Sequence, residues 1–249
     1  RPAPVILGHG ILMTRLCWEL APWLSVPRML AARGHDVFVA EYRGTPGSRR
    51  PPGQARWAYD ARDHAWKDMP ALLDTVRAIT GAPRASWVGH SMGGLVAYLY
   101  ATRFGSERLE RLVTLGSPCR FGPGRPPLRW FLAPAEPLLR WGRPPLSLLL
   151  FLVLPFAVFV PAFGSALAFR RDHLGIRARA GLFGGAFADV AGRLHRWFLL
   201  LKRARRTVGD GSEDPEGLAP GSLARLEAPF LLVAASGDRI APLASVLPA

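Results

Sequence analysis

The sequence predicts an α/β fold, with a mostly parallel sheet, helices on both of its faces and a large cap insertion. Short apolar runs alternate along the chain with stretches whose apolar residues recur every three or four positions. This is the pattern of strands alternating with amphipathic helices. In addition, 249 residues, of which 49% are hydrophobic and 20% charged, suffice to bury the core of one such domain and exclude wholesale disorder.

The expected strands are apolar runs bounded by turn residues, and they lie at Val5–Leu7, Val37–Ala40, Ser86–Gly89, Leu109–Leu115 and Pro229–Ala234. Between them, helices are expected at 16–33, 66–80 and 92–104. Gly34 and Gly81 end the first two helices as C-caps. Pro70 predicts either a kink in the second helix or a new first turn.

The alternation stops after Ser117, and this break defines the expected domain organisation. Residues 1–117 form the first part of the core, residues 118–228 a cap insertion rich in Pro, Leu, Arg and Trp, and residues 229–249 the second part of the core. The chain opens at Arg1 without an initiator methionine and stops without a closing element. We therefore expect it to be truncated at both ends.

Charge and cysteine content exclude several function classes. The net charge is +14, but the arginines are scattered and no basic stripe is interleaved with aromatic residues, so no nucleic-acid partner is expected. Cys17 and Cys119 are too few for a disulfide framework and lack metal-ligand spacing. Neither a metal nor an organic cofactor is expected.

The motif that carries chemistry is G-x-S-x-G at Gly89, Ser91 and Gly93, between an apolar strand and an apolar helix. A tight strand-to-helix turn would push the Ser91 hydroxyl out of the sheet, and small residues are needed because the turn backbone crowds its neighbours. The helix N-terminus would favour negative charge beside that hydroxyl. We therefore expect Ser91 to be a nucleophile, with His90 pointing away from it.

The loop after the first strand, His9-Gly10-Ile11-Leu12, is placed to help hold a developing oxyanion. In this architecture one backbone N–H comes from such a loop and another from the residue after the nucleophile. The expected donors are the N–H groups of Ile11 and Met92. His9 is expected to pin the loop by hydrogen bonds rather than to act as the base.

Asp238 directly follows the late strand, where an acid can orient a catalytic histidine. An Asp that merely caps a turn is the competing interpretation. In the order Ser, Asp, His, the base should follow Asp238, yet no histidine occurs after His195. We expect the catalytic histidine to lie beyond residue 249.

With these motifs placed, the chain resembles the α/β-hydrolase superfamily, and more narrowly the gastric and lysosomal acid lipases and related bacterial esterases. The resemblance runs from Val5 to about Tyr100, and it rests on His9–Leu12 with Trp18, Gly34–Phe38, Arg43-Gly44, Tyr59-Asp60, Asp68–Ala71, Thr80-Gly81 and Val88–Ser91. It implies that Ser91 is the nucleophile, Asp238 the acid, and Ile11 and Met92 the oxyanion donors. Met92 stands where the eukaryotic members have Gln, and Met at this position is the commoner form in bacterial esterases.

The resemblance implies a serine carboxylic ester hydrolase that takes an apolar acyl or lipid-like ester through an acyl-enzyme. An acyltransferase, a thioesterase and a non-catalytic binding protein stay open as alternatives. Residues 146–169 are uncharged and flanked by arginines. They fit a cap with an acyl pocket, a segment dipping into one leaflet of a membrane, or a membrane span. The expected partner is a small-molecule ester or lipid, with peripheral membrane contact through 146–169 as a further option.

Overall fold

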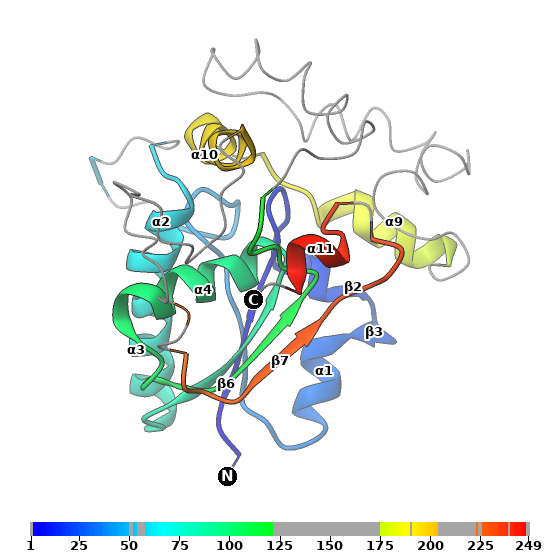
Figure 1. Cartoon of the computed structure of the whole chain (residues 1–249). Coiled ribbons are helices and arrows are strands. Elements are labelled where there is room, and N and C mark those ends of the chain that lie inside the picture. The colour runs from blue at the N-terminus through cyan, green and yellow to red at the C-terminus, as the bar shows by residue number, and fades with distance from the viewer. Residues whose placement is uncertain are drawn as a thin grey trace.

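The computed structural model describes residues 2–49, 52–53, 58–121, 175–189, 191–203, 223, 226–238 and 240–247. At its centre is a five-stranded sheet in the order β4-β1-β5-β6-β7, whose neighbouring strands all run parallel (Figure 1). The strands are β1 (Val5–Gly8), β4 (Val37–Val39), β5 (Ala85–His90), β6 (Leu109–Leu115) and β7 (Phe230–Val233). The predicted parallel α/β fold is confirmed, and every expected strand is present.

The two faces of the sheet carry different helices, as Figure 1 shows. Side chains alternate along each strand. Ile6 and Trp87 pack into a large core with α3 (Met69–Thr80) and α4 (Met92–Phe104). Val5 and Leu7 point to the opposite face, where residues of α1 (Val26–Ala31) cover them.

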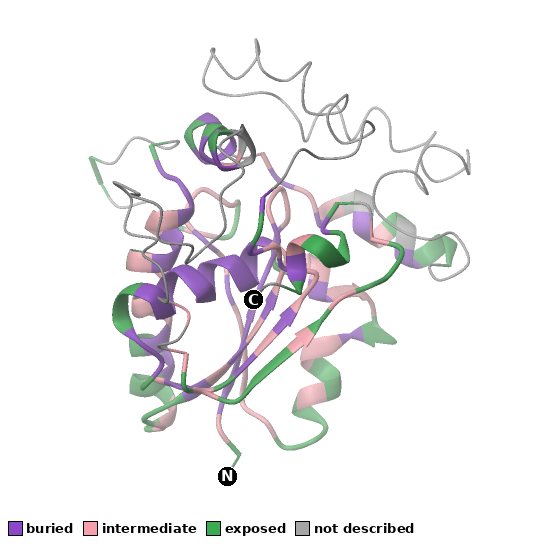
Figure 2. Ribbon diagram, viewed as in Figure 1, coloured by how far each residue is buried: buried purple, intermediate pink, exposed green. Residues whose placement is uncertain are grey.

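Helix α4 is the most deeply buried of the described helices (Figure 2). Its residues from Met92 to Thr102 are all buried. The cause is visible in the sequence, since this stretch carries no charge and little polarity on any side, and a helix that is apolar all round must be enclosed. Because α4 begins immediately after Ser91, the start of this helix is a rigid platform for that residue.

The expected helix at 16–33 is wrong. A 3₁₀ turn at Arg15–Trp18 leads into an antiparallel pair, β2 (Glu19–Ala21) and β3 (Leu24–Ser25), and only then does α1 begin. The Ser25 side chain caps α1 by accepting a hydrogen bond from the Arg28 N–H. Pro27 lies in the first turn of α1, where its missing N–H costs nothing.

Of the two effects predicted for Pro70, a kink or a new first turn, the structure shows the new first turn. Helix α3 begins at Met69, so Pro70 lies in its first turn. The preceding residues form α2 (Ala61–Asp63) and a π turn at His64–Asp68, so one continuous helical segment leads into α3.

Two helices of the 118–228 region are described, α9 (Ile176–Gly185) and α10 (Gly192–Arg203), and a short helix α11 (Leu243–Val246) follows β7. Figure 1 shows α10 beyond the ends of the strands that face away from the N-terminus. Its Leu194 and Trp197 belong to the same hydrophobic cluster as α3 and α4. Residues 146–169 lie outside the described residues, and within the described ranges no helix is long and apolar enough to cross a membrane.

Candidate active site at the carboxyl ends of the strands

Ser91 lies at the junction of β5 and α4 in a strained backbone conformation. Its φ of 51° and ψ of −113° fall in a region that residues with a Cβ rarely adopt. Its N–H donates to the carbonyl of Leu115, at the end of the neighbouring strand β6, over 2.9 Å. Its side chain is partly exposed, whereas Met92 directly after it is buried. The expected sharp strand-to-helix turn is therefore present, with the Ser91 side chain accessible.

Glycines make this turn possible because backbone packs against backbone around it. A Cβ on Gly89 would lie 2.3 Å from the Gly94 nitrogen, and one on Gly93 would lie 2.3 Å from the Gly8 carbonyl oxygen. The first turn of α4 thus rests directly on the end of β1. Gly94, which the motif does not require, is also constrained: a Cβ there would lie 2.1 Å from the Ser117 hydroxyl.

The loop after β1 lies against the serine turn. A Cβ on Gly10 would be 3.0 Å from Nδ1 of His90, so the loop backbone contacts the residue that precedes Ser91. His90 faces this loop and the ring of Trp18, whose centroid is 6.5 Å away. Burial lowers the pKa of His90, and the nearby Asp238 charge opposes that effect. Gly10 and Ser91 are therefore brought together by β1 and β5, which are adjacent in the sheet.

The backbone N–H groups at this junction that lack a hydrogen-bond partner in the described part of the chain include those of Ile11 and Met92. For Met92 this follows from its place at the first position of α4, where N–H groups point out of the helix. Both were the amides expected to face an oxyanion. The loop also contains Leu12, with a φ of 63°. Two non-glycine residues in this unusual conformation, Leu12 and Ser91, thus flank the same region.

The loop is also tied to a segment far along the chain, a feature that sequence patterns did not indicate. Thr14 N–H donates to the Ala186 carbonyl over 2.8 Å, and Ala188 N–H donates to the Leu12 carbonyl over 2.9 Å. The Thr14 hydroxyl donates to the Gly185 carbonyl over 3.0 Å. Residues 185–188, at the C-terminal end of α9 and just beyond it, therefore extend the loop after β1 by an antiparallel bridge.

Asp238 lies at the same edge of the sheet as Ser91, after β7. Its Oδ1 accepts hydrogen bonds from the N–H groups of Ile240 and Ala241, over 2.8 and 2.9 Å. Its Oδ2 points the other way, toward Gly116 at the end of β6, where a Cβ would lie 3.3 Å from it. One carboxylate oxygen is thus fixed by the turn, and the other faces the strand ends and can accept a further hydrogen bond.

None of the described imidazoles hydrogen-bonds to Ser91 or Asp238, and three of them have other hydrogen-bond partners. His9 bonds to the Gly10 carbonyl, and His35 to the Ala3 carbonyl beside β1. His64 bonds to Asp68, and His195 is buried on α10. His173 lies outside the described residues. Ser91, Asp238 and the N–H groups of Ile11 and Met92 therefore lie at one edge of the sheet, and no described imidazole is bonded to the serine or the acid.

Two stretches singled out by the resemblance pair with each other in the structure. Arg43 Nε donates to Asp68 Oδ1 over 2.7 Å, and the Arg43 N–H donates to Asp68 Oδ2 over 3.2 Å. Asp68 also bonds to His64. This cluster supports Tyr42, whose ring centroid lies 4.9 Å from that of His64. Sequence alone marked these residues without indicating that they touch.

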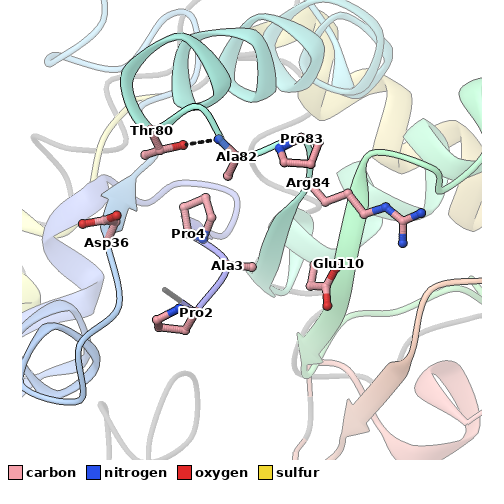
Figure 3. A pocket seen from close by; sticks show the side chains of 9 residues that line it. All are labelled: Pro2, Ala3, Pro4, Asp36, Thr80, Ala82, Pro83, Arg84 and Glu110. Atoms are coloured by element: carbon pink, nitrogen blue, oxygen red, sulfur yellow. Dashed lines mark hydrogen bonds between the residues drawn. The ribbon is translucent and has the colours of Figure 1, made fainter.

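A hollow of about 420 Å³ lies at the opposite edge of the sheet (Figure 3). It is lined by residues at the amino ends of the strands, such as Pro4, Asp36 and Arg84. It is therefore remote from Ser91 along the strands. Within the described residues, no group of three or more His, Cys, Asp or Glu side chains is placed to hold a metal ion.

Comparison with known proteins agrees with the observed fold. A family model described as the alpha/beta hydrolase fold matches residues 3–249. Triacylglycerol lipase 2 of Arabidopsis thaliana is 31% identical over 150 residues, which are 55% of this chain and 36% of that protein. Human gastric triacylglycerol lipase is 32% identical over 101 residues, which are 38% of this chain and 25% of that protein. The chain thus spans about a third, or less, of the length of these curated relatives.

Solved structures show the same fold at low sequence identity. The monoacylglycerol lipase of Paleococcus ferrophilus superposes with a TM-score of 0.58 at 17% identity, over 98% of this chain and 78% of that chain. A thermophilic esterase from Thermogutta terrifontis superposes with a TM-score of 0.53 at 21% identity, over 98% of this chain and 75% of that one.

Proposed function

Because this chain belongs to the α/β-hydrolase family, we propose that it hydrolyses carboxylic esters with an apolar acyl or lipid-like group, using Ser91 as the nucleophile. The observation that carries the proposal is the strained Ser91, partly exposed between β5 and the N-terminus of a buried helix. The lipase and esterase names of the relatives and of the structural neighbours support the choice of ester chemistry.

In the proposed reaction, the Ser91 hydroxyl attacks the ester carbonyl while a histidine takes its proton. The tetrahedral oxyanion accepts hydrogen bonds from the unpartnered N–H groups of Ile11 and Met92. Collapse of that intermediate releases the alcohol and leaves an acyl group on Ser91, which water then removes. The dipole of α4, which begins at Met92, favours the negative charge at each tetrahedral stage.

Asp238 is proposed to orient the histidine and to stabilise its positive charge. The outward Oδ2 is the atom suited to this role, because Oδ1 is already held by Ile240 and Ala241. The base is assigned to a histidine other than the five whose positions are described, consistent with the chain order Ser, Asp, His.

A fluorophosphonate probe tests the nucleophile directly, because it reacts with an activated serine whatever the natural ester is. We expect labelling of a protein that includes the proposed histidine, and none of its Ser91→Ala variant. Ser86→Ala is the matched control, since Ser86 lies near the start of β5, at the opposite end of that strand from Ser91. Labelling that persists in Ser91→Ala would remove the nucleophile assignment.

A failure of the histidine-containing protein to react would favour the second candidate, a non-catalytic binding protein of the same fold. The observation behind that candidate is that no described imidazole hydrogen-bonds to Ser91 or Asp238. Turnover of p-nitrophenyl esters of increasing acyl length separates it from an enzyme and defines the acyl preference. Product analysis with an added alcohol distinguishes hydrolysis from acyl transfer, and matched thioesters test the thioesterase alternative.

The proposed substrate class extends to lipids presented at a surface. The support is the apolar composition of residues 146–169 and their flanking arginines, which suit an acyl pocket or contact with anionic headgroups. Shortening this segment is expected to reduce turnover of long-chain esters more than that of acetate esters. Equal losses on both would remove the acyl-pocket role.

A further inference from the structure

The peptide unit between Gly10 and Ile11 is held through its carbonyl. The Gly10 carbonyl oxygen accepts a hydrogen bond from Nδ1 of His9 over 2.9 Å and a longer one from the Met13 N–H over 3.3 Å. The N–H of this same peptide unit belongs to Ile11 and has no partner among the described residues. A peptide unit is planar, so the bond that fixes its carbonyl also fixes the direction of its N–H.

The loop that contains this peptide unit needs such a restraint. Leu12, one residue further along, has a φ of 63°, which costs free energy for a residue with a side chain. Gly10 and Gly8 themselves carry no side chain that could anchor the loop. A conformation of this kind persists where surrounding groups over-determine it, and His9 is the side chain that bonds to the loop at its centre.

His9 is itself immobile. Its side chain is buried, and its ring centroid lies 4.7 Å from that of Tyr42 in an edge contact. Tyr42 in turn contacts His64, which is bonded to Asp68. A ring enclosed in this way presents Nδ1 to the Gly10 carbonyl from a fixed position.

The bond also determines the tautomer of His9. A carbonyl oxygen can only accept, so Nδ1 must carry the proton. Burial lowers the pKa of His9 to about 4, against the weaker effect of its bond to Gly10, so the ring is neutral near pH 7. Nε2 is then unprotonated and cannot act as a donor toward Tyr42.

We propose that His9 is a positioning residue of the oxyanion site, which aims the Ile11 N–H by holding the Gly10 carbonyl. The proposal rests on the proposed function for its catalytic consequence, but the hydrogen bond and the tautomer are properties of the chain itself. His9 acts through the backbone and does not touch the substrate, so its effect should appear in the transition state and not in ester binding.

The test compares His9→Asn with His9→Leu in the full chain. The Asn side-chain amide places an N–H at nearly the position of Nδ1, whereas Leu fills the space without a donor. We expect His9→Leu to lower kcat by about 10- to 100-fold with KM little changed. A misdirected Ile11 N–H would lose part of the transition-state stabilisation that is lost when an oxyanion donor is deleted. His9→Asn should recover kcat to within about fivefold of the wild-type value.

His35→Leu is the control for removing an imidazole that bonds to a backbone carbonyl, since His35 bonds to the Ala3 carbonyl at the other end of β1 and not to the loop. We expect it to lower thermal stability while leaving kcat near the wild-type value, with all variants assayed where circular dichroism shows them folded. Equal losses of kcat in His9→Asn and His9→Leu would overturn the proposal. A rise in KM with unchanged kcat in His9→Leu would do so as well.

A spectroscopic measurement keeps this inference separate from the hydrolase proposal. If a protein that includes the proposed histidine turns over no ester, the proposed function fails, and nitrogen-15 NMR still reads the tautomer of His9. We expect a neutral ring protonated at Nδ1, together with faster hydrogen exchange of the Ile11 N–H in His9→Leu than in His9→Asn. A ring protonated at Nε2, or equal exchange in the two variants, would overturn the inference.

Discussion

The serine turn and the loop after β1 meet at the same point of the sheet, but they are held in place by different means. The turn is held by backbone packing, because Gly89 and Gly93 leave no room for a Cβ against Gly94 and Gly8. The loop is held by side chains and by a distant segment, through His9, Thr14 and residues 185–188. Both contain a strained residue, Ser91 and Leu12 respectively.

The difference indicates how each half of the site should respond to change. Backbone packing is set by neighbours in the sheet and leaves no alternative conformation of similar energy. Hydrogen bonds from side chains can be removed one at a time, each at a modest net cost. We therefore expect substitutions in the turn to act on the whole fold, and substitutions around the loop to act more on the site.

Gly93→Ala should show the largest effect. The new Cβ would lie 2.3 Å from the Gly8 carbonyl oxygen and 3.0 Å from that of His9, and these backbone atoms cannot move without shifting β1. We expect a loss of about 3 kcal/mol or more in the free energy of unfolding, measured by urea denaturation. Gly81→Ala separates crowding from backbone strain, since Gly81 has a φ of 73° and open space around it.

Gly81→Ala should cost only about 1 kcal/mol, because the left-handed conformation alone is penalised there. If the two variants lose the same free energy, the packing of α4 on β1 is not what requires glycine at position 93.

The next effect is a pH dependence that originates in His9. The pKa of His9 is about 4 in the folded protein, because burial disfavours the charged ring, whereas in the unfolded chain it is about 6.5. Below pH 6.5 the unfolded state binds a proton that the folded state does not. The contribution of the neutral His9 ring to the free energy of unfolding is therefore fully present above pH 6.5. It is lost as the pH falls toward 4, by about 2 kcal/mol between pH 7 and pH 5.

Urea denaturation at pH 7 and pH 5 measures this loss, and His9→Asn is the comparison, since it has no titrating ring. The lowered pKa of His90 also reduces the free energy of unfolding at the lower pH, and it does so in both the wild type and His9→Asn. A slope that is the same in the wild type and in His9→Asn would show that His9 is not buried in its neutral form.

The contrast between the two regions also explains what could be predicted from sequence. The turn at Gly89, Ser91 and Gly93 was predictable because its requirements are local and fall within one motif. The same is true of β6 and α4, whose apolar runs match the observed bounds. Asp238 was predictable as a residue following a strand, because the carboxyl ends of parallel strands meet at one edge.

The region 16–33 shows why the rest could not be predicted. Its apolar periodicity favours a helix, but part of it forms β2 and β3, against which α9 packs. A Cβ on Gly181 of α9 would lie 2.1 Å from the Leu20 carbonyl oxygen. The partner that decides this conformation lies far away in the chain, and no local pattern identifies it. The same applies to the bonds from Thr14 to residues 185–186.

Thr14→Val tests those bonds and should have a smaller effect. It keeps the shape of the side chain but removes the hydroxyl that donates to the Gly185 carbonyl and caps the turn at Leu16. We expect a loss of about 1–2 kcal/mol in the free energy of unfolding and a moderate fall in kcat. Thr14→Ser retains the hydroxyl and should stay near the wild type in kcat. A kcat for Thr14→Val as high as that of Thr14→Ser would mean that the 185–188 segment does not shape the loop.

Arg193→Ala should have the smallest effect, although it too removes a contact between the insertion and the core. Arg193 of α10 bonds to the buried carboxylate of Asp60 over 3.2 Å, but its own side chain is 58% exposed. Burial alone would raise the pKa of Asp60, and the Arg62 guanidinium, bonded to it over 2.8 Å, outweighs that and lowers it. Because Arg62 still neutralises Asp60 in the variant, we expect a loss below about 1 kcal/mol in the free energy of unfolding and no change in kcat. A fall in kcat like that of Thr14→Val would show that the conformation of the loop after β1 depends on the position of α10 against the core, and not on residues 185–188 alone.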